Sequence, residues 1–336
     1  MLKISKSFGV ITIFGFLAAC GGGGGEQSSS ENPKLLQGPT KSLVILDSVK
    51  GELVTLSLGN DQPTVTARTK TNGHNLAYGQ YEQTVYLSNN RPAQPTTAVN
   101  LKTGTQRSFG DKYRSQALVK VPSSYLYSAY TGTFSTGDII RPGTQGYVQR
   151  ISTESGAVEY SDSFGTPEFS ALAVHPSNNI VYAVEPKVQA PFLDPLCLQG
   201  TCTSQVTIYS LAITDNPNAY SGGIFTQWFK EVVIDDYMSV RDASFSPDGS
   251  MLYISGSAGQ LWPVNLIENS MEALTLRGLP DYQGATYFEV EAGGDTGLLA
   301  SRNLGLYRVD LNSGISSLLV EPGVLFTGVS GLQVIK

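Results

Sequence analysis

Five ionisable residues fall within ten positions in the stretch "VIDDYMSVRD" at 233–242. They are Asp235, Asp236, Tyr237, Arg241 and Asp242. Carboxylate, phenol and guanidinium groups that converge on one point can bind a polar ligand or a cation. The same composition also suits a solvated loop in which Arg241 pairs with Asp242. The sequence leaves both interpretations open.

Other candidate site residues lie in comparable places, between apolar stretches. They are His74 in "TNGHNLAYG", Glu168 in "FGTPEF", and the neighbours Asp281 and Tyr282. His175 directly precedes the proline of a turn, so we expect a structural role for it. The chain has two histidines, far apart in the sequence, which excludes a histidine-rich metal centre. The G-x-S-x-G motif of serine hydrolases and the D-x-D-x-D-G calcium-binding loop are both absent from the sequence. We therefore expect no metal and no cofactor, and we assign no catalytic residue.

Two cysteines lie five positions apart in "PLCLQGTC", as Cys197 and Cys202. In an exported protein, cysteines in such a glycine-containing loop can form a disulfide bond. A zinc site would need further ligands, and the loop contains no histidine. We therefore predict a local disulfide.

The N-terminus carries the features of an export signal. Lys3 and Lys6 precede an apolar run that ends at Ala19, and the run is shorter than the roughly 20 residues of a membrane-spanning helix. A charged start, a short apolar middle and small residues at the end are typical of a secretory signal peptide. We therefore predict a signal peptide over residues 1–19. A buried helix that ends in a chance cysteine is the alternative.

The sequence "LAAC" at 17–20 resembles the lipobox of bacterial lipoproteins. The resemblance implies that Cys20 is acylated, that it becomes the mature N-terminus, and that it anchors the chain to a membrane. Residues 20–40, rich in glycine and serine, are then a flexible linker. Gly21 stands where retained lipoproteins of the inner membrane carry aspartate, which implies the outer membrane of a Gram-negative bacterium. Whether the chain faces the periplasm or the cell surface stays open.

The charge balance argues against a polyanionic partner. Removal of residues 1–19 takes away two lysines and no acid, which leaves 20 basic and 28 acidic side chains. The mature chain therefore has a net charge of about −8 and no basic tract, and we expect no nucleic acid partner.

Four short strands with their turns are clearest in residues 239–276. We expect strands over 240–245, 251–255, 260–266 and 271–276. The first turn is Pro247-Asp248-Gly249, in which proline fixes φ and glycine accepts a positive φ. The same plan recurs, in whole or in part, at 43–67, 96–109, 146–164, 170–186 and 297–321.

These repeats predict an all-β fold, a single β-propeller over residues 41–336 with six blades of four antiparallel strands. First strands are expected near Leu76, Ser115, Phe169, Val240, Tyr287 and Val329. The stretch 43–67 lacks a first strand, and 327–336 is a strand with nothing after it. We expect these two segments to share one blade, with 332–335 beside 44–46, because this closes the ring. Seven blades, or a β-sandwich with accidental repetition, are the alternatives.

Two of the repeats, "FSPDGSMLYISGSAGQLWPVNL" and "LAVHPSNNIVYAVEP", resemble those of YVTN, WD40-like and lactonase-like bacterial propellers. The resemblance implies a propeller architecture for the folded chain, although the match is sharp in these two blades only. The shared motif supplies a turn and two strands rather than catalytic groups, so no particular activity is implied. In propellers, the connections from a fourth strand to the next first strand surround the channel mouth, where the ionisable residues above would lie.

Two insertions, 131–145 and 187–204, lengthen the connection between second and third strands of adjacent blades, and so we expect them on one face. They contain apolar residues that are unusual in solvated loops: Phe134, Ile139, Ile140, Phe192 and Leu193. These side chains either form a docking surface or cover one another.

Three functions are compatible with these features. The first is a lipid-anchored, non-enzymatic module that binds another envelope protein or an extracellular ligand. The second is a lactonase-like or other hydrolytic propeller, which would use acids such as Glu168 and Asp235. The third is a glycan-binding lipoprotein, which would need Tyr237, Trp262 and Tyr282 as an exposed aromatic platform.

Overall fold

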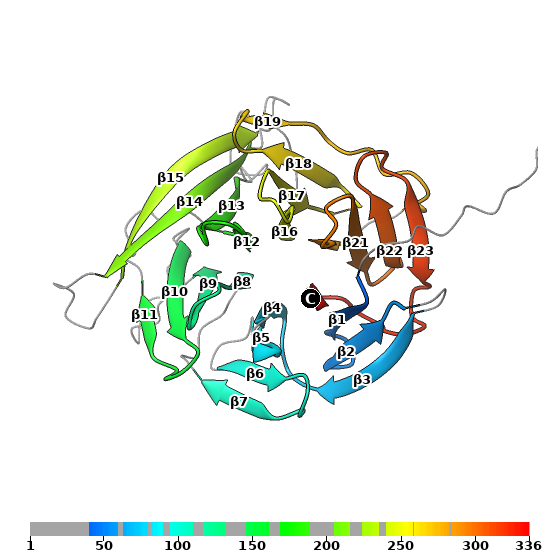
Figure 1. Ribbon diagram of the computed structural model, residues 1–336, viewed down its shortest axis with the longest axis horizontal. Helices are drawn as coiled ribbons and strands as arrows, with labels where there is room; N and C mark the ends of the chain where they lie inside the picture. The colour runs from blue at the N-terminus through cyan, green and yellow to red at the C-terminus, as the bar shows by residue number, and fades with distance from the viewer. Residues whose placement is uncertain are drawn as a thin grey trace, which may run out of the picture. The chain divides into compact units, whose positions relative to one another are not determined.

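The first strand of each repeat contacts the first strand of the next, and these inner strands surround a common axis (Figure 1). The computed structural model describes residues 40–59, 63–79, 82–89, 95–109, 117–131, 146–160, 169–187, 205–215, 224–234, 240–257, 259–281 and 284–335. Within these ranges the strands form six antiparallel sheets of four strands each. The sheets stand in a ring, which confirms the predicted six-bladed β-propeller.

The blades are numbered from the first inner strand along the chain, and the strands of each blade follow one another from the axis outward. Blade 1 contains β4 (Asn75–Gly79), β5 (Thr84–Ser88), β6 (Thr96–Asn100) and β7 (Gln106–Phe109). Blade 2 contains β8 (Ala117–Lys120), β9 (Tyr125–Thr131), β10 (Gly146–Ser152) and β11 (Val158–Tyr160). Blade 3 contains β12 (Ala171–Val174), β13 (Val181–Lys187), β14 (Gln205–Asp215) and β15 (Ile224–Ile234).

The other three blades complete the ring. Blade 4 contains β16 (Asp242–Phe245), β17 (Met251–Ser255), β18 (Leu261–Asn265) and β19 (Ser270–Met271). Blade 5 contains β20 (Tyr287–Val290), β21 (Thr296–Ser301), β22 (Gly305–Asp310) and β23 (Ser316–Val320). Blade 6 contains β24 (Leu332–Ile335), β1 (Ser42–Asp47), β2 (Glu52–Ser57) and β3 (Thr64–Lys70).

Blade 6 joins the two ends of the described chain. Strand β24 is its inner strand and pairs antiparallel with β1, so that Leu43 lies opposite Val334 and Ile45 opposite Leu332. This confirms the predicted closure. Both faces of β1 are buried, because Leu43 and Ile45 pack towards blade 5 whereas Val44 and Leu46 pack towards blade 1. A strand enclosed on both sides explains the unbroken apolar run at its centre.

A buried carboxylate stabilises the joining of the two chain ends in blade 6. Asp47 is fully buried, and its Oδ1 accepts hydrogen bonds from the backbone N–H groups of Val49 and Lys50, each at 3.1 Å. Its Oδ2 accepts a third from the N–H of Thr327 at 2.7 Å. Asp47 thus shapes the turn after β1 and also holds the segment that leads into β24.

The turn at 247–249 links β16 to β17 as predicted, and it also contacts the neighbouring blade. Gly249 has a φ of 78°, which favours glycine. A Cβ atom at this position would lie 2.5 Å from the ring of His175 in blade 3. His175 therefore packs against the turn of the next blade.

The fourth strand of blade 4 is shorter than the predicted 271–276. After β19 the chain stays beside β18 as far as Leu274, whose N–H donates to the carbonyl of Leu261 at 2.9 Å, and it then approaches the outer strand of blade 5. There the N–H of Arg277 donates to the carbonyl of Gly314 and the N–H of Ser316 donates to the carbonyl of Arg277, each at 2.8 Å. Because of these bonds, the chain at Arg277 pairs with blade 5 instead of continuing the fourth strand of blade 4. No helix in the described residues is long and apolar enough to cross a membrane.

Candidate functional site

A cavity of about 320 Å³ lies on the axis, between the inner strands. Residues from all six inner strands border it: β4, β8, β12, β16, β20 and β24. Its volume falls at the small end of the range for small-molecule binding sites.

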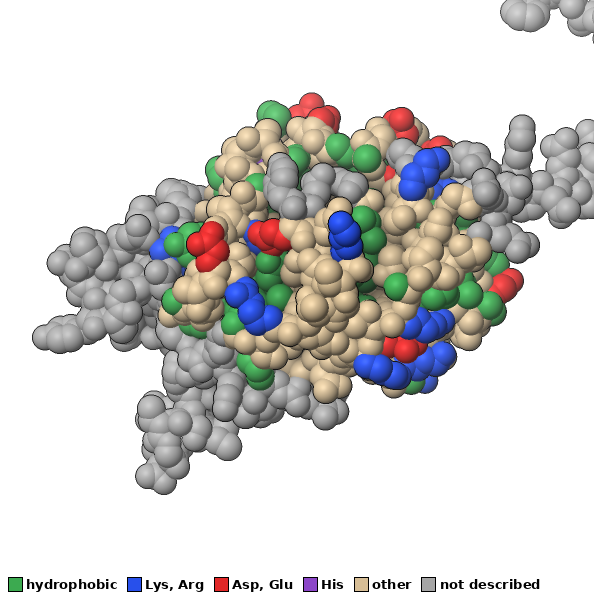
Figure 2. Space-filling model, turned by 60° about the horizontal axis from the view of Figure 1, so that its bottom comes forward, with side chains coloured by type: hydrophobic (Ala, Val, Ile, Leu, Met, Phe, Trp, Pro, Cys, Tyr) green, Lys and Arg blue, Asp and Glu red, His purple; other side chains and the backbone are tan. Residues whose placement is uncertain are grey.

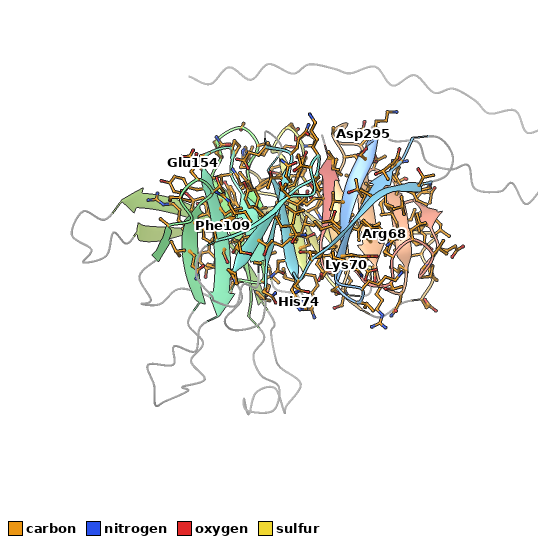
Figure 3. All side chains as sticks on the ribbon, turned by 90° about the horizontal axis from the view of Figure 1, so that it is seen from below. Arg68, Lys70, His74, Phe109, Glu154 and Asp295 are labelled. Atoms are coloured by element: carbon orange, nitrogen blue, oxygen red, sulfur yellow. The ribbon has the colours of Figure 1, made fainter. Side chains whose placement is uncertain are left out.

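The ring has two faces, which Figure 3 shows in side view. His74 and Lys70 lie at the lower face, whereas Glu154 and Asp295 lie at the upper face. His74 directly precedes β4, and Asp295 lies in the turn after β20, so the inner strands run from the lower face to the upper one. Because strands alternate in direction within a blade, connections between second and third strands, and between fourth and next first strands, lie on the lower face.

The two predicted insertions begin and end on this lower face. In blade 2, Thr131 at the end of β9 pairs with Gly146 at the start of β10. In blade 3, Lys187 at the end of β13 pairs with Gln205 at the start of β14. Blades 2 and 3 are neighbours in the ring, so both strand pairs open towards the same side.

One side of the axial cavity carries what we call the polar wall, formed by Asp242, Tyr287, Glu289 and Gln333 of blades 4, 5 and 6. On β20, Tyr287 and Glu289 border the cavity, while the alternate residues Phe288 and Val290 are buried in the core. The side chain of Gln333 donates a hydrogen bond from Nε2 to Glu289 Oε2 at 3.1 Å. This bond joins the inner strands of blades 5 and 6.

Asp242 joins blades 4 and 5 in the same wall. Its Oδ1 accepts a hydrogen bond from the N–H of Ala243 at 3.0 Å, and its Oδ2 accepts one from the N–H of Phe288 at 3.2 Å. Burial raises the pKa of Asp242 to about 7, although both backbone hydrogen bonds act to lower it. The residue as a whole keeps part of its surface exposed. Asp242 is therefore a carboxyl group that changes charge near neutral pH.

The opposite side, which we call the apolar wall, belongs to blades 2 and 3. Ser170 and Asn179 border the cavity there together with aliphatic residues, most of whose side chains are buried in the cores between blades: Ala117, Leu118, Val119, Val121, Pro122, Ala171, Leu172, Ala173 and Val174. One charged side chain interrupts this series, that of Lys120, which is 5% exposed. Its Nζ lies 3.2 Å from Glu82 Oε1 and donates to the carbonyl of Val121 at 2.9 Å. The cation is thus neutralised at the upper end of the cavity.

Four of the described residues were predicted to surround the channel mouth: Arg241 and Asp242 border the cavity, whereas His74 and Asp281 do not. Arg241 is exposed at the lower end, and no ion pair links it to an acid within the described part of the chain. His74 lies at the lower face, where its N–H donates to the carbonyl of Ser88 at 2.8 Å. Asp281 is exposed and away from the cavity wall.

Several predicted residues lie outside the described ranges. They are the lipidation candidate Cys20, the disulfide candidates Cys197 and Cys202, the insertion residues Phe134, Ile139, Ile140, Phe192 and Leu193, and the channel-mouth candidates Glu168, Asp235, Asp236, Tyr237 and Tyr282.

Trp262 does not fit the predicted aromatic platform. It is 4% exposed and packs in the core between blades 3 and 4. The glycan-binding alternative required an exposed Trp262, and that requirement is not met, because the third strand of this blade is covered by the neighbouring sheets.

Sequence reasoning missed Tyr287, Glu289 and Gln333. In "YFEV" and "LQVI" the polar residues Glu289 and Gln333 stand between buried apolar ones, which is a signal for these two residues, whereas Tyr287 also packs against a core cluster. Within the described ranges, no group of three or more histidine, cysteine, aspartate and glutamate side chains is placed to hold a metal ion.

Basic side chains gather over the outer strand of blade 6 (Figure 2). Arg68 and Lys70 of β3 both pair with Glu52, which is nearly buried, and the distance from Lys70 Nζ to Glu52 Oε2 is 3.6 Å. Lys50 and Lys70 border a groove of about 450 Å³ between blades 6 and 1. The nearly buried Glu52 therefore pairs closely with Arg68, whereas Lys70 is 79% exposed and lies within ion-pair distance of the same carboxylate.

No protein-family model matches the chain, and no curated protein matches it. Solved structures do. One, described as the crystal structure of a nidogen/laminin complex, is 10% identical with a TM-score of 0.61, over 88% of this chain and 98% of that one. Hydrazine synthase of Kuenenia stuttgartiensis is 12% identical with a TM-score of 0.54, over 86% and 81%.

A protein of unknown function from Bacteroides caccae is 10% identical with a TM-score of 0.55, over 89% of this chain and all of that one. At such low identities these matches support the β-propeller fold alone.

Proposed function

We propose that this chain is a lipid-anchored binding module of the bacterial envelope. Its lower face would hold another envelope protein or an extracellular ligand, and Cys20 would tether it to the outer membrane. The resemblance of residues 17–20 to a lipobox and the flexible composition of residues 20–40 support the tether. The resemblance of the repeats to YVTN and lactonase-like propellers supports a bacterial envelope origin.

The arrangement of the two faces carries the proposal. Thr40, the first described residue, donates a hydrogen bond from its N–H to Glu291 Oε1 at 3.2 Å. Glu291 belongs to the turn after β20, where its carbonyl accepts a hydrogen bond from the N–H of Gly294. This turn lies at the upper face. Thr40, at which the predicted linker would end, therefore lies at the upper face, whereas the strand pairs that bracket both insertions open at the lower one. A partner at the lower face would meet no obstruction from the tether.

The insertions supply the contact surface in this proposal. Their apolar residues, Phe134, Ile139, Ile140, Phe192 and Leu193, would bury surface against the partner. A disulfide between Cys197 and Cys202 would reduce the entropy lost when this surface becomes ordered. The similarity to a propeller solved in a nidogen/laminin complex is compatible with protein binding by the fold.

Photocrosslinking in intact cells tests the binding face. A photoreactive amino acid is placed at residue 134 or 192, and at residue 295 on the upper face as the control. We expect the same partner to be captured from both lower positions and not from residue 295. Equal capture from residue 295, or products spread over abundant proteins, would contradict the proposal.

A separate measurement tests the tether. Replacement of Cys20 by alanine should abolish incorporation of radiolabelled palmitate and release the protein from the membrane fraction. Retention of label in the variant would show that Cys20 is not the lipidated residue.

A further inference from the structure

The groove between blades 6 and 1 has the side chains of an anion-binding site. No acidic residue of the described chain borders it, and it shares no bordering residue with the axial cavity. Its two cations are Lys50 and Lys70, and hydroxyl and amide groups come from Asn72, Thr97 and Ser108. Ammonium, hydroxyl and amide groups can all donate hydrogen bonds to an anion.

Backbone contacts bring the two lysines to the same groove. Lys50 and Gly51 lie in the turn between β1 and β2, and this turn contacts the chain at the end of β3. The N–H of Thr71 donates to the carbonyl of Gly51 at 2.9 Å, and Lys70 Nζ donates to the carbonyl of Lys50 at 3.3 Å. Gly51 allows this close approach, because its φ is 64° and a Cβ atom there would lie 3.1 Å from the carbonyl oxygen of Thr71.

The backbone acceptors around the groove, which would repel an anion, already have donors. The two carbonyls of the turn accept the bonds just described. The carbonyl of Lys70 accepts a hydrogen bond from Gln106 Nε2 at 2.7 Å, and the carbonyl of Asn72 accepts one from Asn89 Nδ2 at 3.0 Å. These four carbonyls are therefore paired within the protein.

The local charge balance is positive, although the whole chain has a net charge of −6. Glu52 pairs with Arg68 through Oε1, and its Oε2 lies 3.6 Å from Lys70 Nζ. Asp47 is fully buried and accepts hydrogen bonds from backbone N–H groups. No ion pair links Lys50 to an acid within the described part of the chain. Three cations thus stand against two acids, which favours an anion in the groove.

An unsatisfied polar atom belongs to a residue that borders the same groove. Thr71 is 7% exposed, and its hydroxyl oxygen has no hydrogen-bond partner among the described residues. Buried polar atoms without a partner are uncommon in folded proteins and often mark a site for water or a ligand. Thr71 directly follows Lys70, so a ligand oxygen or a water beside that lysine would supply the missing partner.

We propose that this groove binds an anionic sugar, a phosphate or sulfate ester, with its oxyanion at Lys50 and Lys70. A tetrahedral oxyanion accepts several hydrogen bonds at once, which suits a set of ammonium and hydroxyl donors. The groove volume of about 450 Å³ admits a monosaccharide together with its ester group. The remaining hydroxyl and amide side chains of the groove match the hydroxyl groups of a sugar. The site lies on other blades than the proposed partner surface, so that either proposal can fail without the other.

Saturation-transfer NMR on the full-length chain, in an uncharged detergent at low salt, tests the proposal with matched probes. They are glucose 6-phosphate, glucose 6-sulfate and glucose. We expect both esters to bind at least about tenfold more tightly than glucose, because glucose lacks the charge that the lysines favour. Inorganic phosphate is added as a competitor. It should displace the esters, but only at a concentration at least about threefold above theirs, because it makes no contacts through a sugar.

Three variants locate the site. The double replacement Lys50→Gln and Lys70→Gln removes both ammonium groups and should weaken binding of glucose 6-phosphate at least about tenfold. Lys50→Gln alone leaves the pairs of Glu52 intact and should weaken binding at least about threefold. Both lysines are exposed, so the urea midpoint should stay close to that of the natural chain. Lys102→Gln, at an exposed lysine in the turn between β6 and β7, is the matched control and should leave binding unchanged.

Four results would each overturn the proposal. They are binding of glucose as tight as that of its esters, no effect of the double variant, equal weakening by Lys102→Gln, and no saturation transfer to either ester at about 10 mM, a concentration well above the dissociation constant of even a weak ligand.

Discussion

Replacement of Asp242 by asparagine tests whether folding favours the protonated form of a carboxyl group in the cavity wall. Burial raises the pKa of Asp242 from 3.8 to about 7, against the opposing effect of hydrogen bonds from the N–H groups of Phe288 and Ala243. Between these pH values the folded chain binds a proton that the unfolded chain has released. The free energy of unfolding therefore decreases as the pH rises through this window.

The magnitude follows from the size of the shift. One pKa unit corresponds to about 1.4 kcal/mol, so the part of the window above pH 5 would cost about 3 kcal/mol for a carboxyl group sealed from water. Asp242 keeps part of its surface exposed, so we expect water to reduce this cost to about 1 to 2 kcal/mol. Asparagine does not titrate, and the variant should lose none of this stability between pH 5 and pH 8.

Urea unfolding of the full-length chain at pH 5, 6, 7 and 8 measures the difference. The natural chain should lose about 1 to 2 kcal/mol relative to Asp242→Asn as the pH rises. The variant Asp295→Asn, which removes an exposed acid from the upper face, should follow the natural chain. If the natural chain and Asp242→Asn stay parallel across the four pH values, Asp242 is ionised in the folded state and the reasoning fails.

Two further substitutions test the packing between and within blades. Gly249→Ala should destabilise the chain by about 2 kcal/mol or more, because alanine disfavours a φ of 78° and its Cβ would meet the ring of His175. A second substitution, His175→Ala, in the Gly249→Ala variant should restore the part of the stability that the clash removes. An unchanged urea midpoint in Gly249→Ala would contradict the contact. Glu291→Gln should cost about 3 to 5 kcal/mol, because Arg308, whose Nε lies 2.8 Å from Glu291 Oε2, would keep its charge in the core after losing the Glu291 carboxylate. Glu289→Gln, at a partly exposed acid two residues away, is the matched control and should change stability by less than about 0.5 kcal/mol.

The fold could be predicted because its signals are local. The Pro247-Asp248-Gly249 turn identifies the clearest blade, and short strands with similar turns elsewhere in the chain indicate the other blades. The closing blade followed from two incomplete repeats, one at 43–67 and one at 327–336. Their pairing in β1 and β24 satisfies strand edges that would otherwise be open.

The site could be predicted only in part, because a four-residue strand does not reveal which of its faces meets the axis. Glu289 and Phe288 alternate on β20, and the cavity side is decided by how blades 4, 5 and 6 pack together. The length of β19 was mispredicted for a related reason. Arg277 pairs with blade 5 rather than with its own sheet, and such long-range pairing leaves no trace in the local pattern.

The position of β24 has a practical consequence for anyone who labels this protein. Strand β24 is the inner strand of its blade and runs towards the upper face, so a chain that continues past Ile335 leaves the fold beside the axis (Figure 1). A C-terminal affinity tag or fluorescent reporter would therefore start at the rim of the cavity and could act as a plug. The exposed hairpin turn around Thr103, between β6 and β7 on the outer half of blade 1, is the safer place for an inserted epitope.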